Sequence, residues 1–192
     1  MKTIKISREE IEARVARYQG LRRMKNQDDA GFPQDAIDVA FARELLPVIG
    51  LEDKSQTALT DAGDTPINGA GGMTMTMVKC PPGQGPGLHS HLSTYETFTV
   101  LQGRFEFSWG DHGEDSITLG KFDVVSFPPG FCRAFRNVGD EEGIMQVLIT
   151  GGTHDMNDID FRPEVALALK EKSPDLLTTL EQRGMTFTAG QE

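Results

Sequence analysis

Apolar and polar residues recur with a helical period at the two ends of the chain and with a strand period between them. Near the N-terminus, apolar residues three or four apart predict a helix over about residues 8–25, and Ser7 with Glu10 fits a capping box at its start. A shorter helix is predicted next, between two Gly/Pro-containing breakers, by the apolar stripe Ile37, Phe41, Leu45 and Val48. We therefore expect a helical N-terminal extension over residues 1–52.

Between about residues 55 and 150 the alternation has a period of two, which is typical of strands with one buried face. Gly, Pro and Asp turns separate the alternating stretches, so we expect an antiparallel sandwich or barrel over residues 53–152. The predicted strands are residues 73–79, 97–102, 104–109, 116–119, 123–127 and 144–150. Period two does not say which face looks inward, but candidates for the barrel interior are Met75, Met77, Phe98, Phe105, Phe107, Phe135 and Gln146.

Beyond the strands, residues 153–192 return to a helical pattern and are expected to form a C-terminal extension. Pro163 fits the first position of one helix, and Ser173 and Gly184 fit the N-cap and C-cap of a second. These helices should cover an open end or outer face of the barrel, or a partner subunit. The acidic run before them is expected to be a solvated loop containing Asp155, Asp158 and Asp160.

Composition excludes several classes of partner. The chain has 29 acidic and 19 basic residues and a net charge of -10, which disfavours nucleic acid and anionic membranes. No apolar run approaches the roughly 20 residues of a membrane span, and the N-terminus lacks the apolar region of a signal peptide, so we expect a cytoplasmic protein. Cys80 and Cys132 are accordingly expected to be free thiols. A helix-turn-helix is disfavoured because an acidic Gly/Pro stretch separates the two N-terminal stripes.

Two of the four histidines, His89 and His91, are one residue apart, and Glu96 follows five residues later. In a strand, residues i and i+2 leave the same face, so both imidazoles can point at one metal ion about 2.1 Å from each nitrogen. Histidine pairs of this spacing also occur on surfaces without a metal, so both interpretations stay open. His154 is a distant candidate for a further ligand, and His112 is expected to be exposed in a charged turn.

The same residues belong to a longer pattern. Gly83, His89, His91, Glu96 and Gly103 have the spacing G(X)5HXH(X)4E(X)6G, which resembles the first motif of the cupin superfamily without a mismatch. Residues 122–137 resemble the second motif, GDxxxxPxGxxHxxxN, except that Phe122 stands at the usual glycine and Arg133 at the last histidine. The resemblance spans about residues 70–150. It implies an all-β core, a cupin jelly-roll barrel, here with α-helical N- and C-terminal extensions.

The resemblance also implies a metal. In cupins of this pattern two histidines, the glutamate and the later histidine hold iron, manganese, nickel, zinc or copper, and here His89, His91 and Glu96 carry over. We expect a divalent transition metal, with iron first and manganese, nickel or zinc as alternatives. A set of two histidines and one carboxylate leaves positions for substrate and O2, which favours a non-haem dioxygenase. The superfamily also contains isomerases, lyases and decarboxylases, so the fold does not choose the reaction.

Arg133 divides the functional hypotheses. In the first, Arg133 is catalytic and binds a small anionic organic substrate beside the metal, with Gln146 and Phe98 as further substrate-binding residues. In the second, Arg133 pairs with Glu96 in place of the metal, and the protein is a non-enzymatic cupin that binds a small ligand. In either case we expect a homodimer, because a second subunit would cover exposed sheet edges and the N-terminal helix.

Overall fold

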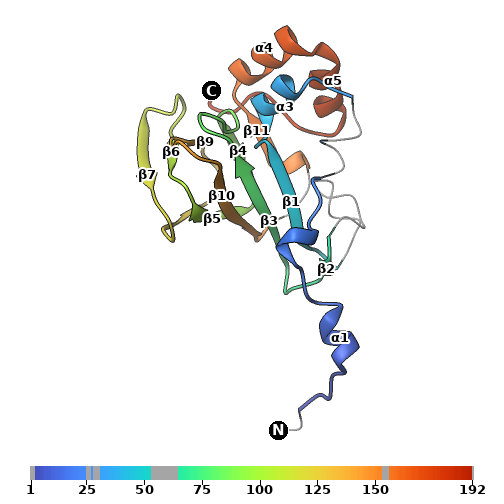
Figure 1. The fold of residues 1–192 in the computed structure, drawn as a ribbon. Helices are drawn as coiled ribbons and strands as arrows, with labels where there is room; N and C mark the ends of the chain where they lie inside the picture. The colour runs from blue at the N-terminus through green and yellow to red at the C-terminus, as the bar shows by residue number, and fades with distance from the viewer. Residues whose placement is uncertain (1–2, 25–26, 28–30, 53–64, 153–155, 192) are drawn as a thin grey trace.

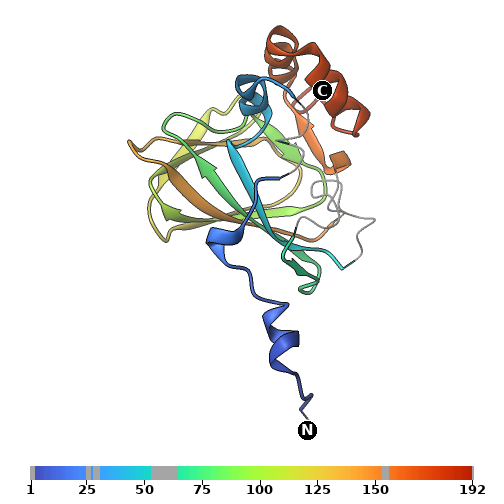
Figure 2. The same cartoon turned by 45° about the vertical axis from the view of Figure 1, so that its right-hand side comes forward.

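The structure is a computed structural model and describes residues 3–24, 27, 31–52, 65–152 and 156–191. Two β-sheets pack face to face, three helices gather at one end of them, and the N-terminal segment projects from the opposite end (Figure 1, Figure 2). Among the described residues, no helix has the length and apolar character that a membrane crossing needs.

The two sheets are separate and do not close into a continuous barrel. The first has the strand order β2-β1-β3-β10-β5-β8, with β1 Glu44–Gly50, β2 Ile67–Asn68, β3 Met73–Cys80, β5 Tyr95–Gln102, β8 Val124–Phe127 and β10 Gly143–Thr150. The second has the order β11-β4-β9-β6-β7, with β4 His89–His91, β6 Phe105–Trp109, β7 Asp115–Leu119, β9 Arg133–Asn137 and β11 Ile159–Phe161. The all-β core and the six predicted strands are therefore confirmed.

The core between the sheets is built around aromatic rings. Phe98, Phe105, Phe107 and Phe135 are all buried there and contact one another at ring-centroid distances of 5.2 to 6.1 Å. The prediction that Met75 and Met77 are interior is wrong, because both pack with Leu46 and Val48 in a separate cluster. Successive residues of β3 alternate, so Thr74, Thr76 and Val78 take the inner face instead.

The N-terminal helix is much shorter than predicted. Ser7 forms the expected capping box with Glu10, but α1 spans only Arg8–Glu12 and buries no residue. A single 3-10 turn, Tyr18–Gly20, follows. Few isolated helices this short are stable in water without a packed face. Met24, the last apolar residue of the predicted helix, lies outside any helix: it is buried, and its N–H donates to the carbonyl of Leu45 at 2.7 Å.

The second predicted helix also stops early. The helix α3 spans Gln34–Ala40, and Phe41 already has extended angles (φ -129°, ψ 157°). Leu45 and Val48, which matched the helical spacing, lie instead on β1, where a register shift near Pro47 accommodates the missing N–H. The apolar run in this segment satisfies both periods, and pairing with β3 decides for the strand. Strand β1 therefore lies within the extension expected to be helical.

The C-terminal helices form where predicted, although Arg183 rather than Gly184 is the C-cap of the second one. They are α4 Pro163–Lys172 and α5 Pro174–Gln182, and the hydroxyl of Ser173 accepts from the N–H of Leu176 as the N-cap of α5. Both pack with α3 and with β11 in one apolar cluster, at the end of the sandwich where β4 lies. Strand β11 thus carries the second sheet past residue 152, the predicted end of the strands. Cys80 and Cys132 are free, as expected.

We expect the projecting segment to make a dimer with a second copy of this chain. Ile4, Ile6, Ile11 and Val15 are 93, 53, 47 and 43% exposed, and such a concentration of apolar side chains is characteristic of an interaction site. Residues 3–24 hold six basic and three acidic residues, whereas the whole chain carries -10, so the segment is electrostatically matched to the rest of a second copy. Deleting residues 1–15 should convert a dimer into a monomer in sedimentation equilibrium. The melting temperature of the monomer unit should change little, because α1 buries nothing; a parent that sediments as a monomer would contradict this expectation.

Candidate metal centre

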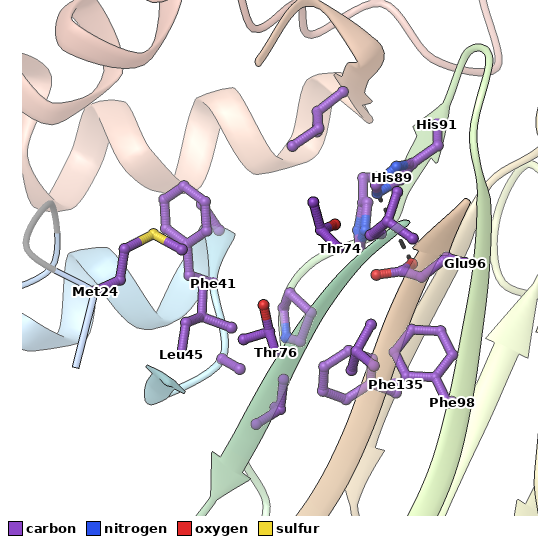
Figure 3. Close-up of a pocket in the computed structure, with 17 residues that line it drawn as sticks. Met24, Phe41, Leu45, Thr74, Thr76, His89, His91, Glu96, Phe98 and Phe135 are labelled. Atoms are coloured by element: carbon purple, nitrogen blue, oxygen red, sulfur yellow. Dashed lines mark ion pairs between the residues drawn. The ribbon is translucent and has the colours of Figure 1, made fainter. Parts of the chain in front are cut away.

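Strands β4 and β5 bring His89, His91 and Glu96 together. The two histidines are two residues apart on the strand and both are buried, and Glu96 comes from β5 in the opposite sheet. One side-chain ligand atom of each residue lies within 4.8 Å of the others, and Nε2 of His91 is 3.8 Å from Oε2 of Glu96 (Figure 3). The two histidines, two positions apart on one strand, therefore lie on the same face of it, as their spacing predicts.

His89 is held in one orientation by its own backbone neighbourhood. Its Nδ1 lies 2.8 Å from the carbonyl oxygen of Gly87. A carbonyl only accepts hydrogen bonds, so Nδ1 carries the ring proton and Nε2 keeps its lone pair. Burial, followed by the charge of Arg133, lowers the pKa of His89 to about 3. The ring is thus neutral near pH 7, which is the form of histidine that binds metals.

His91 is held by a carboxylate from the C-terminal part of the chain. Its Nδ1 lies 2.9 Å from the hydroxyl of Thr94 and 3.1 Å from Oδ2 of Asp158. Asp158 is 5% exposed and also accepts from the N–H and the hydroxyl of Ser93. Burial opposes its ionisation, yet the hydrogen bonds from His91, Ser93 and Thr94 keep the pKa of Asp158 well below its usual value. The carboxylate faces Nδ1, so Nε2 of His91 points towards Glu96.

Glu96 forms an ion pair with Arg133. The guanidinium donates to Oε2 from Nη2 at 2.8 Å and from Nε at 3.2 Å. Arg133 lies on β9 directly opposite His89 and is 1% exposed. Burial opposes ionisation of Glu96, but the positive charge of Arg133 lowers the pKa of this carboxyl below its usual value. Both charges are therefore compensated within the buried site.

The donor set fits a divalent transition metal. Within the described residues, Nε2 of neither histidine has a hydrogen-bond partner, although both rings are buried. Buried polar atoms without a partner are rare and call for an explanation. Two ligand atoms about 2.1 Å from one ion are about 3 to 4 Å apart, so small side-chain movements would close the 4.8 Å cluster around an ion.

A mostly apolar pocket opens from these three residues. Figure 3 shows His89, His91 and Glu96 on one side of the pocket, with Met24, Phe41 and Leu45 across from them. Hydroxyl groups enter its lining from β3. The remaining lining includes Thr74, Thr76, Phe98, Phe135, Val147, Ile149 and Ile159.

Residues 76–150, less than half of the chain, match the family model of the cupin domain. This segment is a cupin domain. The cupin domain holds His89, His91, Glu96 and Arg133, whereas several other residues of the pocket lie outside it. No curated protein matches the sequence of the chain.

Solved structures resemble part of this chain over part of their own length. The cupin domain of Cnp3 from Schizosaccharomyces pombe is 18% identical, with a TM-score of 0.40 over 43% of this chain and 58% of that one. A double-stranded β-helix protein from Klebsiella pneumoniae is 24% identical, with a TM-score of 0.40 over 43% and 70%. A predicted oxalate decarboxylase from Thermotoga maritima is 23% identical, with a TM-score of 0.38 over 41% and 66%.

Other predicted site residues of the cupin domain have different outcomes. Phe98 lines the pocket, and its contact with a substrate stays a prediction. Gln146 does not: it lies on the face of β10 opposite Val147 and donates to the sulfur of Met75 at 3.3 Å. Arg133 is also not among the lining residues, because its guanidinium is turned onto Glu96. The side chain of Arg133 thus contacts Glu96 and that of Gln146 contacts Met75. Contact of either residue with a substrate stays a prediction.

Asp158 and the apolar side of the pocket were not predicted from the sequence. Asp158 was expected in a solvated loop but is buried against His91, and Asp160 is buried with Thr188. Pairing of β11 with β4 brings both acids inside, and the acidic run has no periodic pattern that could have predicted this pairing. His154 and Asp155 lie outside the described residues, and His112 is exposed, as expected.

We expect the protein to lose stability when only one partner of the buried ion pair between Arg133 and Glu96 is removed. Arg133→Met leaves the carboxylate of Glu96 without its cation and should lower the free energy of unfolding of the metal-free protein by about 3 to 5 kcal/mol. Combining it with Glu96→Gln should recover part of this loss in urea titrations. The control is Lys79→Met, which breaks two partly exposed ion pairs, with Glu44 and with Glu142, and should cost less than about 1 kcal/mol. Equal losses for Arg133→Met and Lys79→Met would contradict the assignment.

Proposed function

We propose that this protein is a metal-dependent cupin enzyme that binds one divalent transition metal through His89, His91 and Glu96. One observation carries the proposal: two buried imidazoles present Nε2 atoms, which have no hydrogen-bond partner among the described residues, towards one carboxylate at the side of a pocket. A divalent ion held there would supply Lewis acidity and, if it is iron, electrons for O2. The residues of the chain hold the ligands in place and shape the space beside them.

The pocket supports a small organic acid as substrate. Its lining is mostly apolar, with Met24, Phe41 and Leu45 as an apolar wall across from Glu96. The hydroxyls of Thr74 and Thr76 are also part of the lining. The charge of Arg133 offsets that of Glu96, so a site with a divalent ion keeps a net positive charge and attracts an anionic head group. The apolar wall then accommodates the body of the molecule.

Among reaction classes we favour oxidation by O2. If His89, His91 and Glu96 bind a metal, three protein ligands would leave it positions for a substrate head group and for a second small molecule. Isomerisation, elimination and decarboxylation use the same ligand set without O2. Oxygen uptake by the iron-loaded protein, measured across a panel of organic acids, distinguishes these classes.

Metal content tests the proposal directly. We expect about one iron, manganese, nickel or zinc ion per chain by elemental analysis of protein purified without chelator. His89→Ala should reduce the content at least tenfold, because it removes one of three ligands. The matched control is His112→Ala, which changes an exposed histidine that contacts Arg162 and should leave the content unchanged. Equal metal content in these two variants would refute the ligand assignment.

The ion pair of Arg133 with Glu96 favours a second candidate function. Because each charge already compensates the other, a metal-free protein that only binds a small ligand is also consistent with the contacts. Phenylacetate, which combines an apolar body with a carboxylate, serves as a probe. Binding that is unchanged after exhaustive treatment with EDTA supports this second function, and binding that requires added metal supports the first.

Residues on the two faces of β10 test the pocket itself. Ile149 lines the pocket beside Glu96, whereas the side chain of its neighbour Leu148 leaves the other face of the strand. Ile149→Phe should weaken phenylacetate binding at least tenfold, because the larger ring occupies the space of the ligand. Leu148→Phe is the control and should have little effect. Metal content should be unchanged in both variants, and unaltered binding in Ile149→Phe would place the ligand elsewhere.

A further inference from the structure

We propose that Asp158 is a positioning residue for the metal ligand His91, fixing the ring proton on Nδ1 and keeping Nε2 free. This inference rests on the proposed function, since it concerns the same site. Asp158 lies outside the matched cupin segment, in the short turn Met156–Asp158 that precedes β11. A residue of the C-terminal extension would thus control the geometry of a ligand in the cupin domain.

The carboxylate of Asp158 is surrounded by donors. Oδ1 accepts from the backbone N–H of Ser93 and from its hydroxyl, each at 2.6 Å. Oδ2 accepts from the hydroxyl of Thr94 and lies 3.1 Å from Nδ1 of His91. Both oxygens are therefore occupied on the side away from the pocket, and Asp158 has no oxygen left to bind a metal in place of His91.

The tautomer of His91 follows from the hydrogen-bond donors and acceptors that Thr94 and Asp158 offer. Thr94 has one hydroxyl proton and donates it in a hydrogen bond to the ionised carboxylate of Asp158, since a carboxylate can only accept. The contact of 2.9 Å between Nδ1 of His91 and the oxygen of Thr94 must then use the proton of the ring. The second contact of Nδ1, with Asp158, needs the same proton. Nε2 is consequently the unprotonated nitrogen and the one available to a metal.

The backbone holds Asp158 in register with His91. The N–H of Leu92 donates to the carbonyl of Asp158 at 2.8 Å, and Ile159 pairs with His91 across β11 and β4. The acid cannot turn away without breaking these bonds and exposing buried donors. Outer carboxylates that hold a metal-binding histidine in this way are worth about 10- to 100-fold in metal affinity.

Asp158→Asn tests the inference at nearly constant shape. The N–H of Ser93 is a fixed donor, so the amide oxygen should take the position of Oδ1 and the amide nitrogen that of Oδ2. A donor would then face Nδ1 of His91, which favours moving the ring proton to Nε2. We expect affinity for Zn²⁺ to fall about 10- to 100-fold in competition titrations. The control is Asp160→Asn, a buried acid two residues on that binds Thr188 instead; its affinity should match the parent.

The tautomer is measured without metal. With four histidines in the chain, long-range 1H–15N spectra of the metal-free parent should show His91 protonated on Nδ1, assigned with the help of the His89→Ala protein. Asp158→Asn should move this proton to Nε2, and Asp160→Asn should not. If Asp158→Asn fails to fold, the spectrum of the parent still decides, because a proton on Nε2 there overturns the inference.

The two proposals fail in different ways. A parent that binds no Zn²⁺ but shows the Nδ1 proton refutes the metal function and leaves the role of Asp158 in orienting the ring intact. A parent that binds Zn²⁺ with an affinity that Asp158→Asn does not change refutes the positioning role alone. A loss of affinity in Asp160→Asn equal to that in Asp158→Asn would point to general damage to β11 and also overturn the inference.

Discussion

The site depends on the rule that a buried ring N–H needs an acceptor. Both histidines of β4 satisfy it on the side of Nδ1, with the carbonyl of Gly87 for His89 and with Asp158 and Thr94 for His91. Both Nε2 atoms are left to face the same space as a result. The hydrogen bonds at Nδ1 of each ring thus determine that Nε2 is the nitrogen available to a metal.

Arg133 stands where the resembled pattern has a histidine, and it changes the contacts of Glu96. The resemblance to cupins placed this residue where a fourth ligand is expected, and the structure puts it opposite His89, with its guanidinium on Glu96. A fixed cation in that position cannot coordinate a metal. It instead compensates the charge of Glu96, and a metal bound by His89, His91 and Glu96 would have one protein ligand fewer than in the resembled pattern.

The strands and the three converging residues were predictable, because alternation and spacing are local properties that survive folding. The N-terminal helix was not, because Ile11, Val15 and Tyr18 match a helical stripe but remain 43 to 47% exposed, and no described part of the chain covers them. Leu45 and Val48 fit both periods, and only pairing with β3 chose between them. Asp158 and Gln146 depended on which strands pair and on which face of β10 looks inward, and neither follows from composition or period.

The pocket is assembled from two sources of chain. The ligand residues and the aromatic floor come from the cupin domain, but Met24, Phe41, Leu45 and Ile159 come from segments before and after it. Substitutions in these flanking segments alter the shape of the wall without touching the ligands. If the proposed function is correct, substrate selectivity and reactivity could therefore change separately during evolution, and proteins with the same domain and the same three residues would not have to share a substrate.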